Sequence, residues 1–136
     1  EVFVHPRDPK VRLDILDSSR PVQVTVSGQV VADSNKARLL FETGLPTRYY
    51  LPQDDVHLDF LQPSDLHTSC PYKGTANYWH VKLGNEVFKD LVWSYPDPAP
   101  EAAQIKGYFC FFNEQVGAIH IDGVKTERPV SKWSPK

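Results

Sequence analysis

Short runs of alternating apolar and polar residues, separated by turn residues, constrain the fold of this chain most strongly. Residues 22–26 alternate valine with polar residues, Ser27-Gly28 supplies a turn, and residues 30–32 return as a second apolar run. A period of two places alternate side chains on one face of a strand, as a half-buried β-hairpin requires. No segment has the spacing and length of a long amphipathic helix. We therefore expect strands to build the core.

Two more segments repeat this alternation later in the chain. Residues 76–83 and 87–93 lie on either side of Gly84-Asn85, which predicts a long hairpin. Residues 56–61 also alternate, and we expect them to form a strand that ends before Pro63, because proline cannot donate to a strand ladder.

The aromatic run 108–112 is apolar without alternation and is bounded by Gly107 and Asn113. A continuous apolar run of this length is typical of a strand buried on both faces, and we expect residues 116–121 to pair with it. With the preceding segments this gives about eight short strands. The sequence thus predicts a mostly β domain of short antiparallel sheets with little helix.

Three segments are less regular. Ser34 could cap a helical turn over residues 36–40, although an irregular strand fits this segment equally well. Residues 49–51 should be extended, because Pro52 disfavours the helical region for the residue before it. Residues 97–103 could form one helical turn.

The 136 residues suffice for one domain with its own core. We expect an N-terminal arm over residues 1–20, a single β domain over residues 21–127 and a loose C-terminal tail over residues 128–136. An exposed sheet edge makes a homodimer a further possibility.

Charge and composition exclude several classes of partner. The net charge is −2, and no lysine and arginine cluster is dense enough to bind a nucleic-acid backbone. No stretch approaches the roughly 20 apolar residues of a membrane span. The two cysteines suggest free thiols in a reducing compartment, so we expect a cytoplasmic protein. Because the chain does not begin with methionine, a removed leader stays open.

Three segments combine turn residues and aromatic rings with charged side chains. They are Gly28-x-Val30-Val31-Ala32-Asp33-Ser34 continued by Leu40-x-Glu42, then Thr68-x-Cys70-Pro71-Tyr72-Lys73-Gly74-x-Ala76-x-Tyr78, and Trp93-Ser94-Tyr95-Pro96-x-Pro98. A fourth segment, Tyr49-Tyr50-x-Pro52 with Asp54-Asp55-Val56, lies between the first two. On these segments, over about residues 11–123, the chain resembles the domain of unknown function 427 family. The resemblance implies coiled antiparallel sheets similar to the Mss4-like, or β-tent, group.

Some proteins of that topology bind zinc through paired Cys-x-x-Cys motifs, which this chain lacks. The family is also catalogued under a nucleotidyltransferase label, and such enzymes need a Gly-Ser turn followed by carboxylates that hold two Mg²⁺ ions. Asp54, Asp55 and Asp59 supply carboxylates, but no such turn precedes them. We therefore expect no metal, no cofactor and no nucleotidyl transfer.

Glu42 and Lys73 are the strongest catalytic candidates. Glu42 follows an apolar run, so an inward-facing carboxylate must be paired or protonated, and Lys73, Arg38 or a tyrosine could be its partner. Lys73 lies in a turn-rich segment and could bind an anion or act as a base or imine-forming amine. The alternatives are a structural ion pair and an ordinary surface lysine.

Aromatic residues are frequent in the middle of the chain and could line a ligand pocket; they are Tyr49, Tyr50, Tyr72, Tyr78, Trp79, Trp93 and Tyr95. Tyr50 is the third catalytic candidate, and Tyr72, Trp93 and Tyr95 are expected to bind the substrate, although Trp93 could instead belong to the core.

Cys70 could be a nucleophile if His67 or Lys73 stabilises its thiolate, or it could be a small buried hydrophobe. Asp33 and Arg38 could contact the substrate, although Asp33 could equally serve the turn. The histidines lack the spacing of metal ligands; His57, Asp59 and His80 could converge only across strands.

These residues favour a cofactor-independent enzyme that acts on a small organic molecule by proton transfer, such as an isomerase, a cyclase or a lyase. Glu42 would be the general acid or base, and Lys73 and Tyr50 would stabilise developing negative charge. One alternative is a non-catalytic domain that binds a small molecule or peptide in the same pocket. A second alternative is a hydrolase or transferase that uses Cys70.

Overall fold

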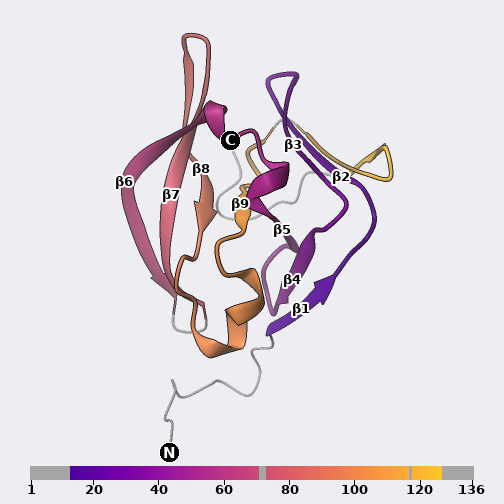
Figure 1. The fold of residues 1–136 in the computed structure, drawn as a ribbon, viewed down its shortest axis with the longest axis vertical. Coiled ribbons are helices and arrows are strands. Elements are labelled where there is room, and N and C mark those ends of the chain that lie inside the picture. The colour runs from indigo at the N-terminus through magenta and orange to yellow at the C-terminus, as the bar shows by residue number, and fades with distance from the viewer. Residues whose placement is uncertain (1–12, 71–72, 117, 127–136) are drawn as a thin grey trace, which may run out of the picture.

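The computed structural model describes residues 13–70, 73–116 and 118–126, which form two antiparallel sheets (Figure 1). Sheet A has seven strands, in the order β1 (Leu13–Asp17), β4 (Arg38–Glu42), β5 (Arg48–Leu51), β9 (Phe109–Phe111), β8 (Glu86–Ser94), β7 (Gly74–Leu83) and β6 (Leu61–Cys70). Sheet B has four, in the order β11 (Val124–Lys125), β10 (Ala118–Ile121), β2 (Val22–Val26) and β3 (Gln29–Ser34). The described helical segments are short 3-10 turns, η1 (Gln53–Asp55), η2 (Leu58–Phe60) and η3 (Pro100–Ile105). The predicted mostly β fold is confirmed.

Both predicted hairpins are confirmed. β2 and β3 pair across a turn in which Ser27 and Gly28 have φ of 50° and 81°. Positive φ at both turn residues matches the twist of the two strands, and glycine adopts it without strain. β7 and β8 form the long hairpin around Gly84-Asn85.

The strand predicted over residues 56–61 is wrong except at Leu61, which begins β6. Only Val56 forms a bridge, to Ala32; the turn η1 ends just before it, and residues 58–60 form the turn η2. Val56 is buried and Phe60 is partly buried, whereas Leu58 is 48% exposed. The alternation in sequence therefore does not correspond to alternating burial, and the turns direct only the two end residues inward.

A ten-residue strand, β6, begins at Leu61 and contains Pro63, where we expected a strand to stop. β6 is the edge of sheet A, so an edge position without an N–H donor breaks no interior ladder. The register with β7 shifts between Pro63 and His67.

The apolar run 108–112 forms β9, whose three residues are all buried, as predicted for a doubly covered strand. Its predicted partner is wrong, because β9 pairs with β5 and β8. Residues 118–121 form β10 and pair with β2 in sheet B. The turn after Phe112 carries the chain from sheet A to sheet B. The prediction assumed that segments adjacent in sequence pair with each other, and it therefore did not anticipate this change of sheet.

The segment after Ser34 is a strand and not a helical turn, the two structures that the sequence left open. The Ser34 hydroxyl accepts a hydrogen bond from the Lys36 N–H, but the chain then extends as β4 instead of forming a helix.

The helical turn predicted at 97–103 occurs as η3. Of the arm predicted over residues 1–20, Leu13–Asp17 forms edge strand β1 paired with β4. Residues 1–12 and the predicted tail lie outside the described residues.

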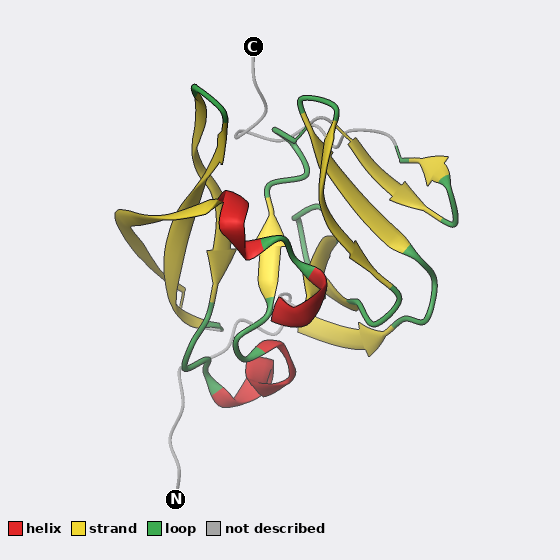
Figure 2. Cartoon of the chain, turned by 45° about the horizontal axis from the view of Figure 1, so that its top comes forward, coloured by secondary structure: helices red, strands yellow, loops and turns green. Residues whose placement is uncertain are grey.

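Sheet A is covered on both faces. One face packs against sheet B around Val24, Val31, Leu51, Val92 and Phe111. The opposite face buries Leu40, Tyr50, Ala76, Trp93, Tyr95 and Cys110 together with Ala102 and Ile105 of η3. Figure 2 shows η3 (red) at the lower end of the strands. We refer to this opposite face and its side chains as the second core.

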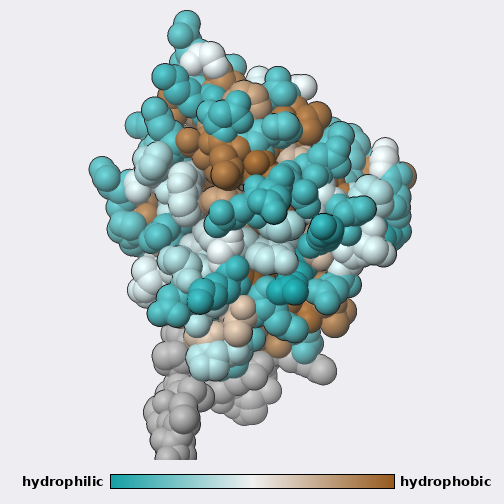
Figure 3. All heavy atoms as spheres, viewed as in Figure 1, coloured by the Kyte–Doolittle hydropathy of each residue, from teal (hydrophilic) through white to brown (hydrophobic). Residues whose placement is uncertain are grey.

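The surface is mostly hydrophilic in the view of Figure 3, and apolar side chains gather in its upper part. Among the described residues, the exposed large apolar side chains are those of Leu16, Phe41, Leu58, Leu66, Val87 and Val124. They belong to several separate elements, so the homodimer stays a prediction. No helix in the described part of the chain is long and apolar enough to cross a membrane.

Replacing Leu51 by Ala tests the core between the sheets. Leu51 is fully buried, so we expect its truncation to lower the free energy of unfolding by about 2–5 kcal/mol. Leu16→Ala is the control, because Leu16 is 58% exposed and should cost no more than about 0.5 kcal/mol. Urea denaturation measures both variants, and equal losses would contradict the described core.

Candidate functional site

Glu42 and Lys73 form an ion pair on the second core. The Lys73 ammonium donates a hydrogen bond to the Glu42 carboxylate, with 2.7 Å between Nζ and Oε1. Each side chain is only 11% exposed, so the pair is nearly buried but still reaches solvent. The attraction between the two charges offsets part of the cost of removing them from water.

The pair joins two distant parts of sheet A. Glu42 ends β4, whereas Lys73 lies in the turn between β6 and β7. In the strand order, β5, β9 and β8 separate β4 from β7. The two side chains can meet only because the sheet is strongly coiled, so that its halves face each other across the second core (Figure 1).

Backbone contacts hold the Lys73 turn in place. The Lys73 N–H donates to the Cys70 carbonyl at 3.2 Å, and the Lys73 carbonyl accepts from the Ala99 N–H at 2.9 Å. Gly74 has φ +108°, and a Cβ at this position would lie 3.1 Å from the Asp97 carbonyl oxygen. Glycine is therefore needed at position 74 for the turn to pack against the loop that follows β8.

Tyr95 completes the surroundings of the pair. Lys73 Nζ lies 6.0 Å from the centre of the Tyr95 ring, at the outer limit of a cation–π contact. Burial raises the pKa of the Tyr95 hydroxyl, and the charges of Cys70, Tyr78, Cys110 and Glu42 raise it further. Tyr95 is thus a neutral phenol beside a carboxylate and an ammonium.

One row of side chains crosses the second core next to the pair. Adjacent strands place these residues opposite one another, in the order Arg38, Tyr50, Cys110, Trp93 and Tyr78. Side chains alternate along a strand, so residues 38, 40 and 42 of β4 all face this side of the sheet. The row is therefore continuous with the ion pair.

Tyr50 and Trp93 lie inside the second core and do not form a cavity wall. Tyr50 is fully buried, and its hydroxyl accepts a hydrogen bond of 3.0 Å from Trp93 Nε1. Burial raises the pKa of Tyr50 well above its ordinary value, so the phenol stays neutral. We expected Tyr50 at a ligand surface, and the structure corrects this; of the two roles open to Trp93, it supports the core and not the pocket wall.

A buried ion pair that the sequence did not indicate lies on the same face. Both terminal nitrogens of the Arg48 guanidinium donate to the Glu114 carboxylate, and both side chains are buried. The guanidinium carbon lies 5.3 Å from the Trp93 ring centre and 5.6 Å from that of Phe112. Burial lowers the pKa of Arg48, but the hydrogen bond to Glu114 and nearby negative charges outweigh it, and the net shift is upward.

The remaining predicted residues lie at different places. Cys70 ends β6, is partly exposed, and is close enough for its charge to raise the pKa of Tyr95. Arg38 begins β4 and pairs with Asp17, away from Glu42. Asp33 is exposed on β3 of the other sheet. Tyr72 lies outside the described residues.

A surface depression of about 270 Å³ lies beside Glu42. It is lined by Asp14, Phe41, Glu42, Thr43, Leu45 and Thr47, from β1, β4 and the connection to β5. Glu42 thus borders an accessible space and also contacts Lys73. Phe41 and Leu45 offer apolar surface, and the two threonines offer hydroxyl groups.

The histidines do not form a metal site in the described part of the chain. His57 and Asp59 are exposed around η2, and His80 Nδ1 accepts a hydrogen bond from the Asp90 N–H. No group of three histidine, cysteine or carboxylate side chains among the described residues could hold a metal ion.

Residues 14–122 match the model of the family described as Domain of unknown function (DUF427). The chain belongs to this family. In this DUF427 domain, the segments that contain Glu42, Lys73 and Tyr95 all lie within the match and meet at the ion pair. The β-tent topology that the resemblance implies stays a prediction. A search of curated proteins finds no match to the sequence.

Replacing Glu114 by Ala tests the buried pair with Arg48. The variant leaves a guanidinium in the second core without its carboxylate, and we expect a loss of about 3–5 kcal/mol in the free energy of unfolding. Glu86→Ala is the control, because Glu86 is exposed on β8. A Glu114→Ala variant as stable as Glu86→Ala would contradict the buried pair.

We expect the buried thiol of Cys110 to make the DUF427 domain less stable at alkaline pH. Burial raises the pKa of Cys110 to about 12, against an ordinary value of 9.0. A raised folded-state pKa means that this contribution is complete below pH 9 and is lost as the pH rises towards 12.

The measurement is urea denaturation between pH 8 and pH 11, with Cys110→Ala as the comparison. We expect the wild type to lose more stability over this range than the variant does. Parallel curves would show that Cys110 is not a buried thiol. In the native protein, iodoacetamide should modify Cys70 before Cys110, because only Cys70 is partly exposed.

Proposed function

We propose that this DUF427 domain is a cofactor-independent enzyme that moves a proton on a small organic molecule, as isomerases, cyclases and lyases do. The observation that carries the proposal is the nearly buried contact between Lys73 and Glu42, a residue that borders a depression. An acid–base enzyme needs both a group that takes a proton and a positive charge that stabilises the anion formed.

Glu42 would take and return the proton. Glu42 is one of the residues that line the depression, and its Oε1 accepts the hydrogen bond from Lys73. A carboxylate oriented by one fixed partner is pre-organised for proton transfer, because it need not reorganise solvent during the reaction.

Lys73 would stabilise the negative charge that develops on a substrate oxygen. An ammonium group has three donors, and Glu42 occupies one of them. The turn around Gly74 and the Tyr95 ring restrict where the ammonium can point. Tyr95, held neutral, would support the charged pair from the core side.

The volume of the depression sets the size of the substrate. About 270 Å³ is slightly below the range of about 300–1,000 Å³ for drug-sized ligands, which favours a small molecule. Free Cys70 and Cys110 agree with a reducing compartment, and we propose that the enzyme works in the cytoplasm.

The experiment follows deuterium incorporation in D₂O by proton NMR, using a panel of small ketones, keto acids and enolisable aromatic compounds. The wild type should accelerate exchange at a carbon of at least one class. Glu42→Gln should slow that exchange by about 100-fold or more, because it removes the base without changing the shape of the side chain. Lys73→Ala should also slow exchange.

Glu86→Gln is the matched control, because this carboxylate is exposed on β8 far from the depression in sequence and sheet position. Circular dichroism checks that each variant is folded. Exchange at the wild-type rate in both Glu42→Gln and Lys73→Ala, or no acceleration by the wild type, would reject the proposal.

A second candidate is a non-catalytic domain that binds a small molecule at the same place. The 2.7 Å contact favours it, because Glu42 and Lys73 neutralise each other and such a pair can serve orientation alone. A binding domain would show saturable ligand shifts by NMR without deuterium exchange.

A third candidate is hydrolysis or group transfer through Cys70. It would require that alkylation of Cys70 abolish activity.

A further inference from the structure

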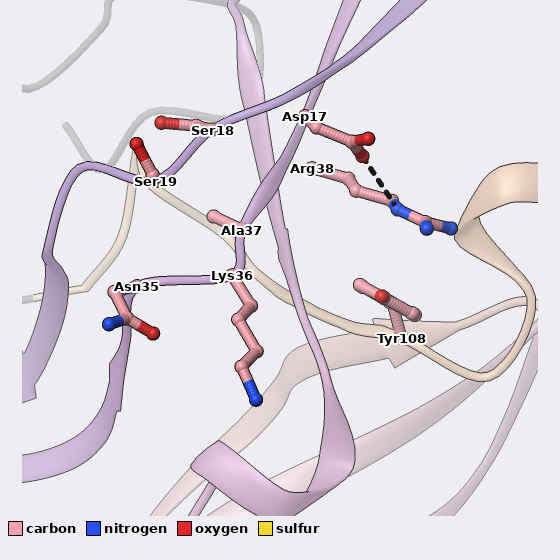
Figure 4. Close-up of a pocket in the computed structure, with 8 residues that line it drawn as sticks. All are labelled: Asp17, Ser18, Ser19, Asn35, Lys36, Ala37, Arg38 and Tyr108. Atoms are coloured by element: carbon pink, nitrogen blue, oxygen red, sulfur yellow. Dashed lines mark hydrogen bonds and ion pairs between the residues drawn. The ribbon is translucent and has the colours of Figure 1, made fainter.

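A second depression, of about 490 Å³, lies at the other end of β4 (Figure 4). Three connections and the start of β4 form it: the β1–β2 turn, the β3–β4 connection, and the segment between η3 and β9. Its lining residues are Asp17, Ser18, Ser19, Asn35, Lys36, Ala37, Arg38 and Tyr108. Its volume falls within the range of small-molecule sites.

The floor of this depression is firmly held. Ala37 is fully buried, and its carbonyl accepts a hydrogen bond of 2.9 Å from the Ser18 N–H. This bond ties the β1–β2 turn to the β3–β4 connection. The Ser34 hydroxyl fixes the same connection by accepting from the Lys36 N–H at 3.0 Å and donating to Asp55 at 2.6 Å.

Arg38 forms one wall and is held at a fixed position. Its Nε donates to Asp17 at 3.0 Å, one terminal N–H donates to the Gln104 carbonyl, and its guanidinium carbon lies 5.0 Å from the Tyr108 ring centre. Arginine has five N–H donors, so these contacts leave donors for a ligand. The planar group is thus pre-organised.

Lys36 is the second cation and lies across the depression from Arg38 and Tyr108 in Figure 4. Among the described residues, its ammonium has no carboxylate within salt-bridge distance, and the one carboxylate of the lining, Asp17, pairs with Arg38. The lining therefore contains two cations and one carboxylate, with an excess of one positive charge. The hydroxyls of Ser18 and Ser19 and the Asn35 amide add neutral donors.

We propose that this depression binds the oxyanion group, a phosphate or a carboxylate, of a small organic molecule. Lys36 would pair with the oxyanion, Arg38 would donate from its fixed position, and the serine hydroxyls and the Asn35 amide would complete the donors. A bare ion would fill only part of the volume, so the remaining space and Tyr108 would receive the organic portion.

The site is separate from the Glu42–Lys73 pair and does not rest on the proposed function. Arg38 and Glu42 lie four residues apart on β4, about 13 Å along an extended strand. None of the residues that line one depression lines the other. Glu42→Gln should therefore leave anion binding unchanged, and failure of one proposal does not imply failure of the other.

The experiment is a proton–nitrogen NMR titration of the full chain with phenyl phosphate, benzoate and benzyl alcohol. We expect saturable shifts of the amides of Ser18, Ser19, Lys36 and Tyr108 with at least one anionic probe, and none with the neutral alcohol. Tighter binding of phenyl phosphate assigns the site to a phosphate, and tighter binding of benzoate assigns it to a carboxylate.

Lys36→Ala should weaken binding of the preferred anion by about tenfold, because it removes a charge-assisted hydrogen bond. This side chain is exposed and makes no ion pair with the described residues, so the variant should fold. Lys82→Ala is the matched control, since Lys82 is exposed on β7 and should bind as the wild type does. Equal affinity in Lys36→Ala and the wild type, or no saturable shift with either anion, would overturn the proposal.

Discussion

The structure depends on the burial of sheet A on both faces. Phe109 and Phe111 of β9 pack towards sheet B, and Cys110 between them packs into the second core. A sheet covered on both sides must pair any polar group it buries, because an unpaired charge or donor away from water is costly. The Glu42–Lys73 pair, the Arg48–Glu114 pair and the bond from Trp93 to Tyr50 meet this requirement.

Local patterns predicted the hairpins because alternation and turn residues act between neighbours in sequence. The continuous apolar run likewise indicated that β9 is buried on both faces. The partner of β9 could not be inferred in this way, because both of its neighbours are distant in sequence. Edge strand β6 was missed because solvent covers most of its side chains, and burial therefore imposes no alternation on its sequence.

The candidate site was predictable in part. Glu42 and Lys73 lie in the motifs that resemble the family, and they contact each other. Arg48 and Glu114 had no local signal, since they are 66 residues apart and meet only when the sheet coils. Aromatic composition alone does not distinguish a pocket wall from a core, and Tyr50 lies in the core.

The central claim is that Glu42 and Lys73 act on a substrate as one unit. A double-mutant cycle on the rate of deuterium exchange tests it, with the wild type, Glu42→Gln, Lys73→Ala and the double variant. Groups that act together are strongly non-additive, so the double variant should be no slower than the slower single variant. If the two single losses multiply in the double variant, the two side chains act independently and the account is contradicted.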